Sequence, residues 1–253
     1  MGIEGAGIAT ALGASISVLI MLTHFAGKRS TLRLTMPQNF LRTVGEISAS
    51  GFSSFIVDVA MGVMTMLFNI QVMKLLGSDA LAVYGVIVTV STFVQCCAYG
   101  IGQAAQPIIS QNFGAGLEDR TRAALRYSLI TSVIMGVLWT AISEALPNGI
   151  IRLFMTPTEP VLEIAPAIIR VYASSFILLP VNVFSTYYFQ ATMMTRRSGI
   201  VSVARGIVIS GALIMLLPHI AGPDSIWWAM PLTETIVFIY ALGGFTRPAV
   251  PAK

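Results

Sequence analysis

Long apolar runs separated by short polar segments dominate this chain, and one of them carries no charge from Ala80 to Leu117. A helix that crosses a bilayer needs about 20 predominantly apolar residues. The pattern therefore predicts an all-α, polytopic membrane helix bundle with about seven transmembrane helices. The expected spans cover residues 4–25, 47–73, 80–110, 125–146, 164–192, 199–218 and 226–245.

The uncharged run ends in a segment of mixed character, Gly100 to Gly116, which reads GIGQAAQPIISQNFGAG. Its amides are Gln103, Gln106, Gln111 and Asn112. Amides left unpaired in hydrocarbon cost several kcal/mol each, so a lipid-facing helix would not carry them so densely. We expect this helix to face other protein or a water-filled cavity.

The basic residues lie unevenly on the two sides of the predicted spans. Twelve of the fifteen Lys and Arg follow the first, third, fifth or seventh span, and three lie on the other side. The positive-inside rule places the twelve in the cytoplasm. We expect a multi-pass protein of the cell membrane with its N-terminus outside and its C-terminus cytoplasmic. Trp227 and Trp228 are interpreted as an interfacial aromatic anchor.

The composition excludes several other classes of protein. Only 10% of the residues are charged, against about 25% in soluble domains, and the mean hydropathy is +0.81. No basic patch suits a nucleic-acid partner. No metal-ligand spacing, protease motif or phosphate-binding loop occurs, so we expect neither an enzyme nor a cofactor. The adjacent Cys96 and Cys97 cannot form an ordinary disulfide framework, and we interpret them as small buried side chains.

Two acids lie deep in predicted spans, Asp58 in the second and Glu234 in the last. A charge at the bilayer centre costs at least ~2.5–3.5 kcal/mol, so such residues usually face an interior and act there. We expect Asp58 and Glu234 to serve ion or proton coupling, or substrate binding. The alternative is an acid tied to a hydroxyl or an arginine for packing. Arg205 can pair with either acid or extend to the cytoplasmic surface, and we favour the surface.

Further amides lie within the spans. The candidates for lining a polar cavity are Asn69, Gln103, Gln106, Asn182, Gln190 and Arg205. Together with the thirteen methionines they suit a pocket for small amphipathic molecules, since methionine adapts to many shapes. Ordinary hydrogen bonding between helices is the alternative for each amide.

The chain resembles the MATE family, the multidrug and toxic compound extrusion transporters. The most specific segment is GIGQAAQPIISQNFGAG, followed by Glu118, Asp119 and Arg120. Supporting segments are LFNIQVMKLLGSDALAVYG, IIRLFMTPTEPVLEIA and YYFQATMMTRRS. The family has two six-helix lobes. The resemblance implies that residues 1–27 hold the last helix of a first lobe, 28–46 a cytoplasmic linker, 47–246 the C-terminal lobe and 247–253 a cytoplasmic tail.

The resemblance also implies a function. Family members export amphipathic or cationic drugs in exchange for Na⁺ or H⁺, and one bacterial branch carries a coupling acid on the helix that matches the one with Asp58. Glu234 lies in a P-x-x-E context that resembles a sub-branch. Two alternatives stay open: a lipid-linked saccharide flippase of the same superfamily, and a non-transporting half-protein. The expected partners are membrane lipid, small substrates, and either a missing N-terminal lobe or a second copy of the chain.

Overall fold

The computed structural model describes residues 2–26 and 40–245, and within these ranges the chain is helical with no β-strand. The chain forms two compact units, residues 1–52 and 53–253. In the first unit, α1 (Gly2–Ala26) is 25 residues long. At ~1.5 Å per residue this length is enough to cross ~30 Å of hydrocarbon. The hydroxyls of Ser15 and Ser17 donate to the carbonyls of Ala11 and Gly13, so they are satisfied within the helix.

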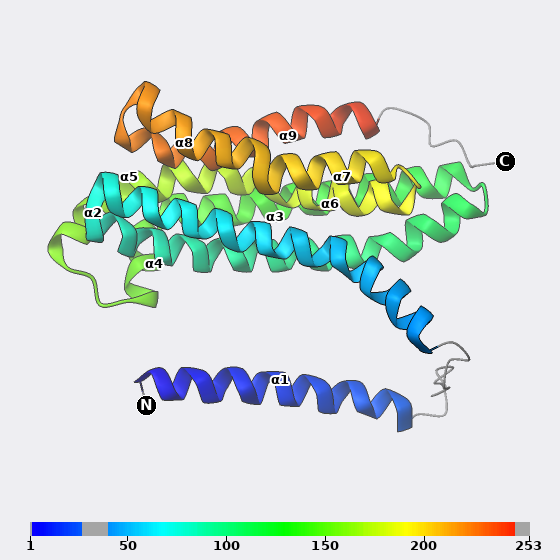
Figure 1. Ribbon diagram of the computed structural model, residues 1–253. Helices are drawn as coiled ribbons and strands as arrows, with labels where there is room; N and C mark the ends of the chain where they lie inside the picture. The colour runs from blue at the N-terminus through cyan, green and yellow to red at the C-terminus, as the bar shows by residue number, and fades with distance from the viewer. Residues whose placement is uncertain (1, 27–39, 246–253) are drawn as a thin grey trace. The chain divides into compact units, whose positions relative to one another are not determined.

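The helix α2 (Phe40–Gly114) reverses its direction at Gly77, where φ is 84° and ψ is −172° (Figure 1). This conformation is essentially restricted to glycine, because a Cβ would clash with the backbone. We call residues 53–76 the first limb and residues 78–114 the second limb. The predicted turn between two spans is therefore confirmed. Residues 40–46 of the predicted linker are helical and belong to α2, and the predicted domain boundaries stay a prediction.

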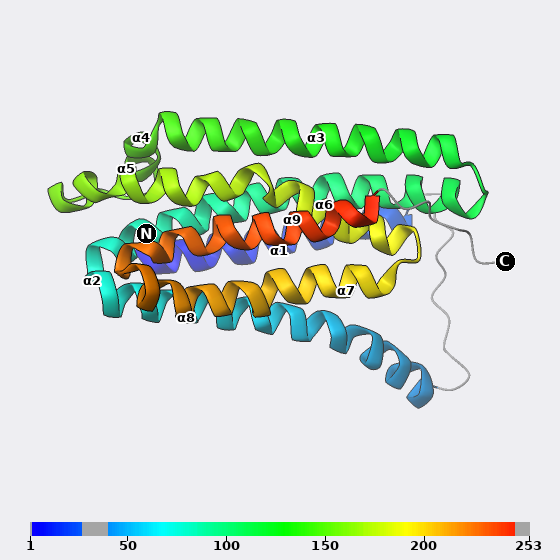
Figure 2. The same cartoon turned by 90° about the horizontal axis from the view of Figure 1, so that it is seen from above.

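The remaining elements of the second unit follow in short succession. They are α3 (Glu118–Ala145), α4 (Pro147–Phe154), α5 (Glu159–Ala173), η1 (Ser174–Ile177), α6 (Leu179–Ala191), α7 (Thr195–Val203), η2 (Ala204–Val208), α8 (Ile209–Ala221), η3 (Pro223–Trp228) and α9 (Ala229–Phe245). Figures 1 and 2 show that the long helices of this unit run side by side along one common direction.

Five segments of the described chain are long and apolar enough to cross a membrane: 62–114, 118–145, 159–191, 195–221 and 223–245. The first of them holds residues 62–76 of the first limb and the whole second limb, because Gly77 lies inside it. With α1, the described chain has seven long helical segments, which confirms the predicted helix bundle.

Two of these segments change helix type near their middle. Residues 159–191 pass from α5 through the 3₁₀ turn η1 into α6, where Pro180 follows directly. Proline has no N–H group and disfavours α-helix in the residue before it, which explains the break. Residues 195–221 pass through the π-helical turn η2, in which the N–H of Ile209 donates to the carbonyl of Ala204. Such wide turns occur often at functional sites.

An aromatic group joins the first limb, the second limb, α5 and η3. The rings of Phe68 and Tyr84 are stacked at 4.3 Å between centroids, and Tyr172 and Trp227 pack against both. Trp227 is only 3% exposed, so its predicted role as an interfacial anchor is wrong: its ring fills the core. Trp228, the next residue, is half exposed and stays a candidate for the interface.

Candidate functional site

A carboxylate, a guanidinium and an amide meet inside the second unit, each from a different element. Glu234 of α9 and Asn182 of α6 are fully buried, and the side chain of Arg205 in η2 is 15% exposed. The Nε of Arg205 donates to Oε1 of Glu234 at 2.7 Å. The Nδ2 of Asn182 donates to Oε2 of the same carboxylate at 2.6 Å. We call these three residues the buried charge cluster.

The orientation of the Asn182 amide follows from its neighbours. Nδ2 also donates to the main-chain carbonyl of Glu234 at 2.8 Å, so it contacts two acceptors. A flipped amide would place Oδ1 against both acceptors, which is repulsive. In the arrangement found, Oδ1 is buried and accepts no hydrogen bond from the described residues. Asn182 Oδ1 is therefore an acceptor beside the carboxylate that can still receive a hydrogen bond.

The cluster corrects one expectation about Arg205. The side chain does not extend to the membrane surface; it turns inward and pairs with Glu234. The reason is that Glu234 lies near the middle of the segment 223–245, where an unpaired charge is costly. Tyr172 on α5 lies near both Glu234 and Arg205, and Tyr99 on the second limb lies near Arg205.

The other predicted site residues do not join the cluster. Gln106 on the second limb donates to Gln190 of α6 at 3.3 Å, so these two amides bond between helices. Gln103 is exposed, and Asn69 on the first limb is half-buried. Asp58 belongs to the first limb, but its side chain lies outside the described residues.

One face of the second limb is exposed and uncharged, and its side chains are small or polar apart from Phe93, which is exposed at its edge. It comprises Gly85, Thr89, Thr92, Cys96, Gly100, Gln103 and Pro107. These positions recur every three or four residues and so share one side of the helix. Cys96 is exposed here, which corrects the expectation that both cysteines are buried. We call this surface the polar face.

The exposed side of α3 has a different character. Its exposed residues include Ile130, Val133, Ile134, Val137 and Leu138. Large aliphatic side chains suit contact with lipid tails, whereas small and amide side chains suit water, a solute or a close helix partner. The polar face is therefore better suited than the exposed side of α3 to contact with something other than lipid.

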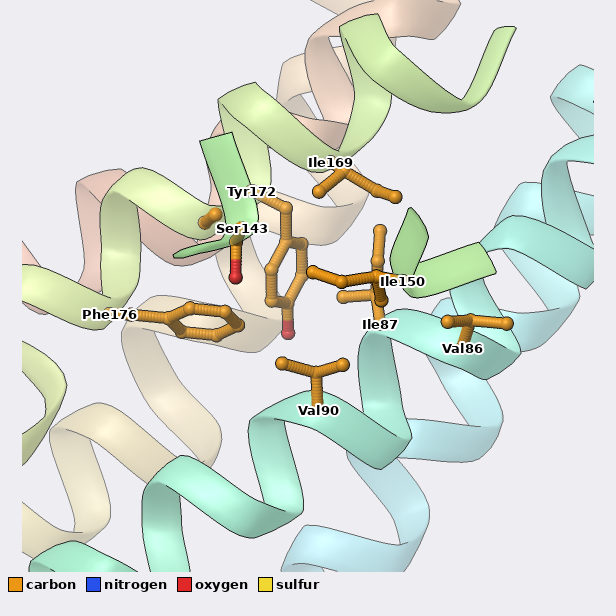
Figure 3. A pocket seen from close by; sticks show the side chains of 9 residues that line it. Val86, Ile87, Val90, Ser143, Ile150, Ile169, Tyr172 and Phe176 are labelled. Carbon is orange, nitrogen blue, oxygen red and sulfur yellow. The ribbon is translucent and has the colours of Figure 1, made fainter. Parts of the chain in front are cut away.

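One small void lies inside the second unit. Figure 3 shows a void between the second limb, α3, α4, α5 and η1, with Ser143, Tyr172 and Phe176 among its walls. Its volume is about 10 Å³, which is room for roughly one water molecule. Drug-sized ligands need about 300–1,000 Å³, so this void is not their site.

Sequence reasoning named all three members of the buried charge cluster. It gave the pairing of Arg205 with Glu234 only as the less favoured alternative, and it did not link Asn182 to either residue. The three residues lie on three different elements. Their spacing in the sequence follows no helical period, so it does not indicate that they meet. The polar face did have a signal, the recurrence of small and polar residues at helical spacing within the uncharged run. Only its last amides were recognised.

Comparison with known proteins places these features in a family context. A family model described as MatE matches residues 53–215. The multidrug export protein MepA of Staphylococcus haemolyticus is 26% identical over 245 residues, which are 96% of this chain and 53% of that protein. MepA of Staphylococcus saprophyticus is 23% identical, with the same coverage. The chain thus spans about half the length of the curated relatives it matches.

Solved structures share the fold. The MATE multidrug transporter DinF-BH superposes with a TM-score of 0.77 and 24% identity, over 98% of this chain and 56% of that one. An outward-facing MATE family transporter of the MOP superfamily superposes with a TM-score of 0.79 and 16% identity, over 97% of this chain and 57% of that one.

Proposed function

Because this chain belongs to the MatE family, we propose that it is part of a multidrug efflux transporter that exchanges amphipathic, cationic substrates for Na⁺ or H⁺. The relatives named multidrug export protein support this function, as do the five long apolar segments expected of a multi-pass membrane protein. No feature of the described residues suggests a chemical reaction on a substrate.

The polar face carries this proposal. The void in Figure 3 is too small for a drug, so we look for the substrate path on a surface of the unit. The polar face presents hydroxyl, thiol and amide groups without any charge of its own. Such a surface admits a hydrated, amphipathic cation without binding it too tightly to leave, as alternating access requires. We therefore place the substrate path along Thr92, Cys96 and Gln103.

The buried acids are the candidates for coupling. Glu234 is held in the buried charge cluster, and Asp58 stays a second candidate on the first limb. A coupling ion has to stabilise one conformation of the transporter more than the other, because an ion bound equally well to both shifts nothing. A buried carboxylate with a mobile counter-charge meets that requirement.

Efflux of a fluorescent cationic dye from cells tests the function. The full chain is expressed alone and together with the part of the S. haemolyticus relative that it does not match, under Na⁺ and H⁺ gradients applied separately. We expect gradient-driven efflux in at least one combination. Absence of efflux from every combination, with the protein shown to be inserted in the membrane, would contradict the proposal.

A matched pair of substitutions tests the place of the substrate path. Thr92 of the polar face and Thr131 of α3 are both exposed, and each hydroxyl donates to the carbonyl four residues earlier. Thr92→Trp places a bulky ring in the proposed path, so we expect efflux to fall at least about tenfold, or ~1.4 kcal/mol in the transport barrier. Thr131→Trp points to lipid and should leave efflux nearly unchanged. Equal effects would rule out the polar face as the path.

A further inference from the structure

We propose that Glu234 is a proton site at which H⁺ and the guanidinium of Arg205 exchange, so that the coupling ion of this cluster is H⁺ and not Na⁺. This inference rests on the proposed transport function, because it names the ion that drives it. It is argued from the geometry of the buried charge cluster.

The first step concerns Na⁺. Both oxygens of the Glu234 carboxylate already accept hydrogen bonds, from Arg205 Nε at 2.7 Å and from Asn182 Nδ2 at 2.6 Å. A Na⁺ ion on this carboxylate would lie beside a guanidinium that is never deprotonated, and two cations would repel strongly in a dry interior. Na⁺ also needs several oxygen ligands, while the groups that point at the carboxylate are N–H donors. The cluster is built to exclude a metal cation.

The second step concerns the state without Arg205. A carboxylate left alone in an apolar interior is too costly to persist, and it becomes neutral by binding a proton. One proton is taken from a hydronium ion of the aqueous side, which becomes water, and one O–H bond forms on the carboxyl group. Arg205 keeps its charge and moves toward the side from which it is 15% exposed. The buried site then holds a neutral acid in place of an ion pair.

The third step concerns what keeps the site intact during the exchange. Asn182 bonds the main-chain carbonyl of Glu234 as well as its side chain, so one of its two bonds does not depend on the protonation state. Its Oδ1 is buried and has no donor among the described residues, so it is available to accept from the protonated carboxyl group. Asn182 is in this sense a positioning residue for the proton.

The fourth step concerns how Arg205 can move. It lies in the π-helical turn η2, where the hydrogen bond from Ile209 N–H to Ala204 O encloses one residue more than in an α-helix. A π-helical turn converts to regular α-helix by a shift of one residue, which rotates the side chains it carries. Release of Arg205 from Glu234 and a change in η2 would then be one event.

The titratable groups around α9 indicate that Glu234 and Arg205 form the pair at which the proton exchanges with the guanidinium. Of the elements packed against α9, η2 contributes Arg205 and α5 contributes Tyr172, both of which interact with Glu234. Tyr99 of the second limb interacts with Arg205. The remaining groups lie away from the middle of α9. They are Glu159, Glu163 and Arg170 on α5, Tyr187, Tyr188, Arg196 and Arg197 near the α6–α7 turn, Tyr240 toward the end of α9, and His219 and Asp224 near the α8–η3 turn.

Infrared spectroscopy of the full chain in lipid tests the proposal without any transport. The readout is the C=O stretch of a protonated carboxyl group, identified by its shift in D₂O. Arg205→Met removes the counter-charge, and we expect it to show this band at neutral pH where the unaltered chain does not. The band should vanish in the Arg205→Met/Glu234→Gln double variant. This double variant keeps Asp58 and every other acid of the single variant, so it differs from Arg205→Met only at Glu234.

Two further arms make each result decisive. If Arg205→Met does not fold, the unaltered chain is acidified instead, and its spectrum is compared with that of the double variant, which is neutral at both positions. The difference between the two spectra should contain the C=O band of protonated Glu234. Replacing choline by Na⁺ should not remove that band. A missing band at every pH, or a band that Na⁺ suppresses, would overturn the proposal. Dye efflux without the band would refute the proton site alone, and the band without efflux would refute the transport function alone.

Discussion

The side-chain amide of Asn182 makes two hydrogen bonds to a single residue, Glu234: 2.8 Å to its main-chain carbonyl and 2.6 Å to its carboxylate. The two residues lie on different helices, α6 and α9, and both are fully buried. The Asn182 amide therefore links α9 to α6 by two buried hydrogen bonds.

Asn182→Leu should destabilise the fold. Leucine has a similar volume but no donor, and each buried acceptor left without a donor costs about 1–3 kcal/mol. We expect the free energy of unfolding, measured by SDS titration in mixed micelles, to fall by about 2–4 kcal/mol. The control is Gln190→Leu on the same helix, an exposed position where the change should stay below about 0.5 kcal/mol. Equal losses at both positions would refute the fastening role.

The ion pair between Arg205 and Glu234 should show strong coupling in a double-mutant cycle. Glu234→Gln alone leaves the Arg205 guanidinium buried without its carboxylate, which costs about 3–5 kcal/mol. Arg205→Met alone removes the partner of Glu234, and the variant loses the ion pair even though the carboxyl group binds a proton. The double variant removes both charges, so we expect it to recover most of that loss. The same SDS titration measures all four proteins. Additive losses would mean that the two side chains do not interact in the membrane.

Gly136→Ala should loosen the contact between α3 and η1. A Cβ at Gly136 would lie 2.5 Å from the carbonyl oxygen of Ile177, and backbone cannot yield as a flexible side chain can. We expect a loss of about 1–3 kcal/mol, as for other overpacked positions. Gly62→Ala is the matched control, since its Cβ would meet nothing within 4 Å and alanine favours helix by roughly 0.5–1 kcal/mol.

Gly77→Ala should strain the reversal between the two limbs of α2. The backbone at Gly77 has φ of 84° and ψ of −172°, a region that costs other residues about 1–3 kcal/mol. Gly85→Ala lies in regular helix with open space around it and should not be destabilising. The thermal unfolding midpoint in detergent distinguishes the two variants. A stable Gly77→Ala protein would show that this turn has another conformation.

Cys96 should react with a maleimide faster than Cys97. Cys96 is exposed on the polar face, and Cys97, one residue on, is half-buried. With the single variants Cys97→Ala and Cys96→Ala, we expect the rate of labelling by a membrane-impermeant reagent to differ at least about tenfold, or ~1.4 kcal/mol. A bound cationic dye should slow the reaction of Cys96 only. If Cys96 reacts with a lipid-soluble maleimide but not with the membrane-impermeant one, the polar face lies against lipid.

Much of the architecture could be predicted from the sequence because it depends on local properties. Backbone groups in hydrocarbon have to bond within their own segment, so a long apolar run becomes a helix whatever surrounds it. For this reason the seven helical segments and the turn at Gly77 follow from hydropathy and composition. The presence of an acid in the middle of the last span, Glu234, is equally visible in the sequence and already indicates a site in the protein interior.

The partners of that acid depend on the tertiary structure. Whether Arg205 extends to the surface or turns inward depends on how the helical segment α7–η2–α8 is rotated about its axis. The sequence does not specify this rotation, because apolar residues lie on every side of the segment. The same holds for Trp227, which fills the core while Trp228 does not, and for Cys96, which is exposed while its neighbour is half-buried. Hydropathy determines that a helix lies in the membrane; packing against neighbouring helices determines which of its faces meets lipid, water or protein.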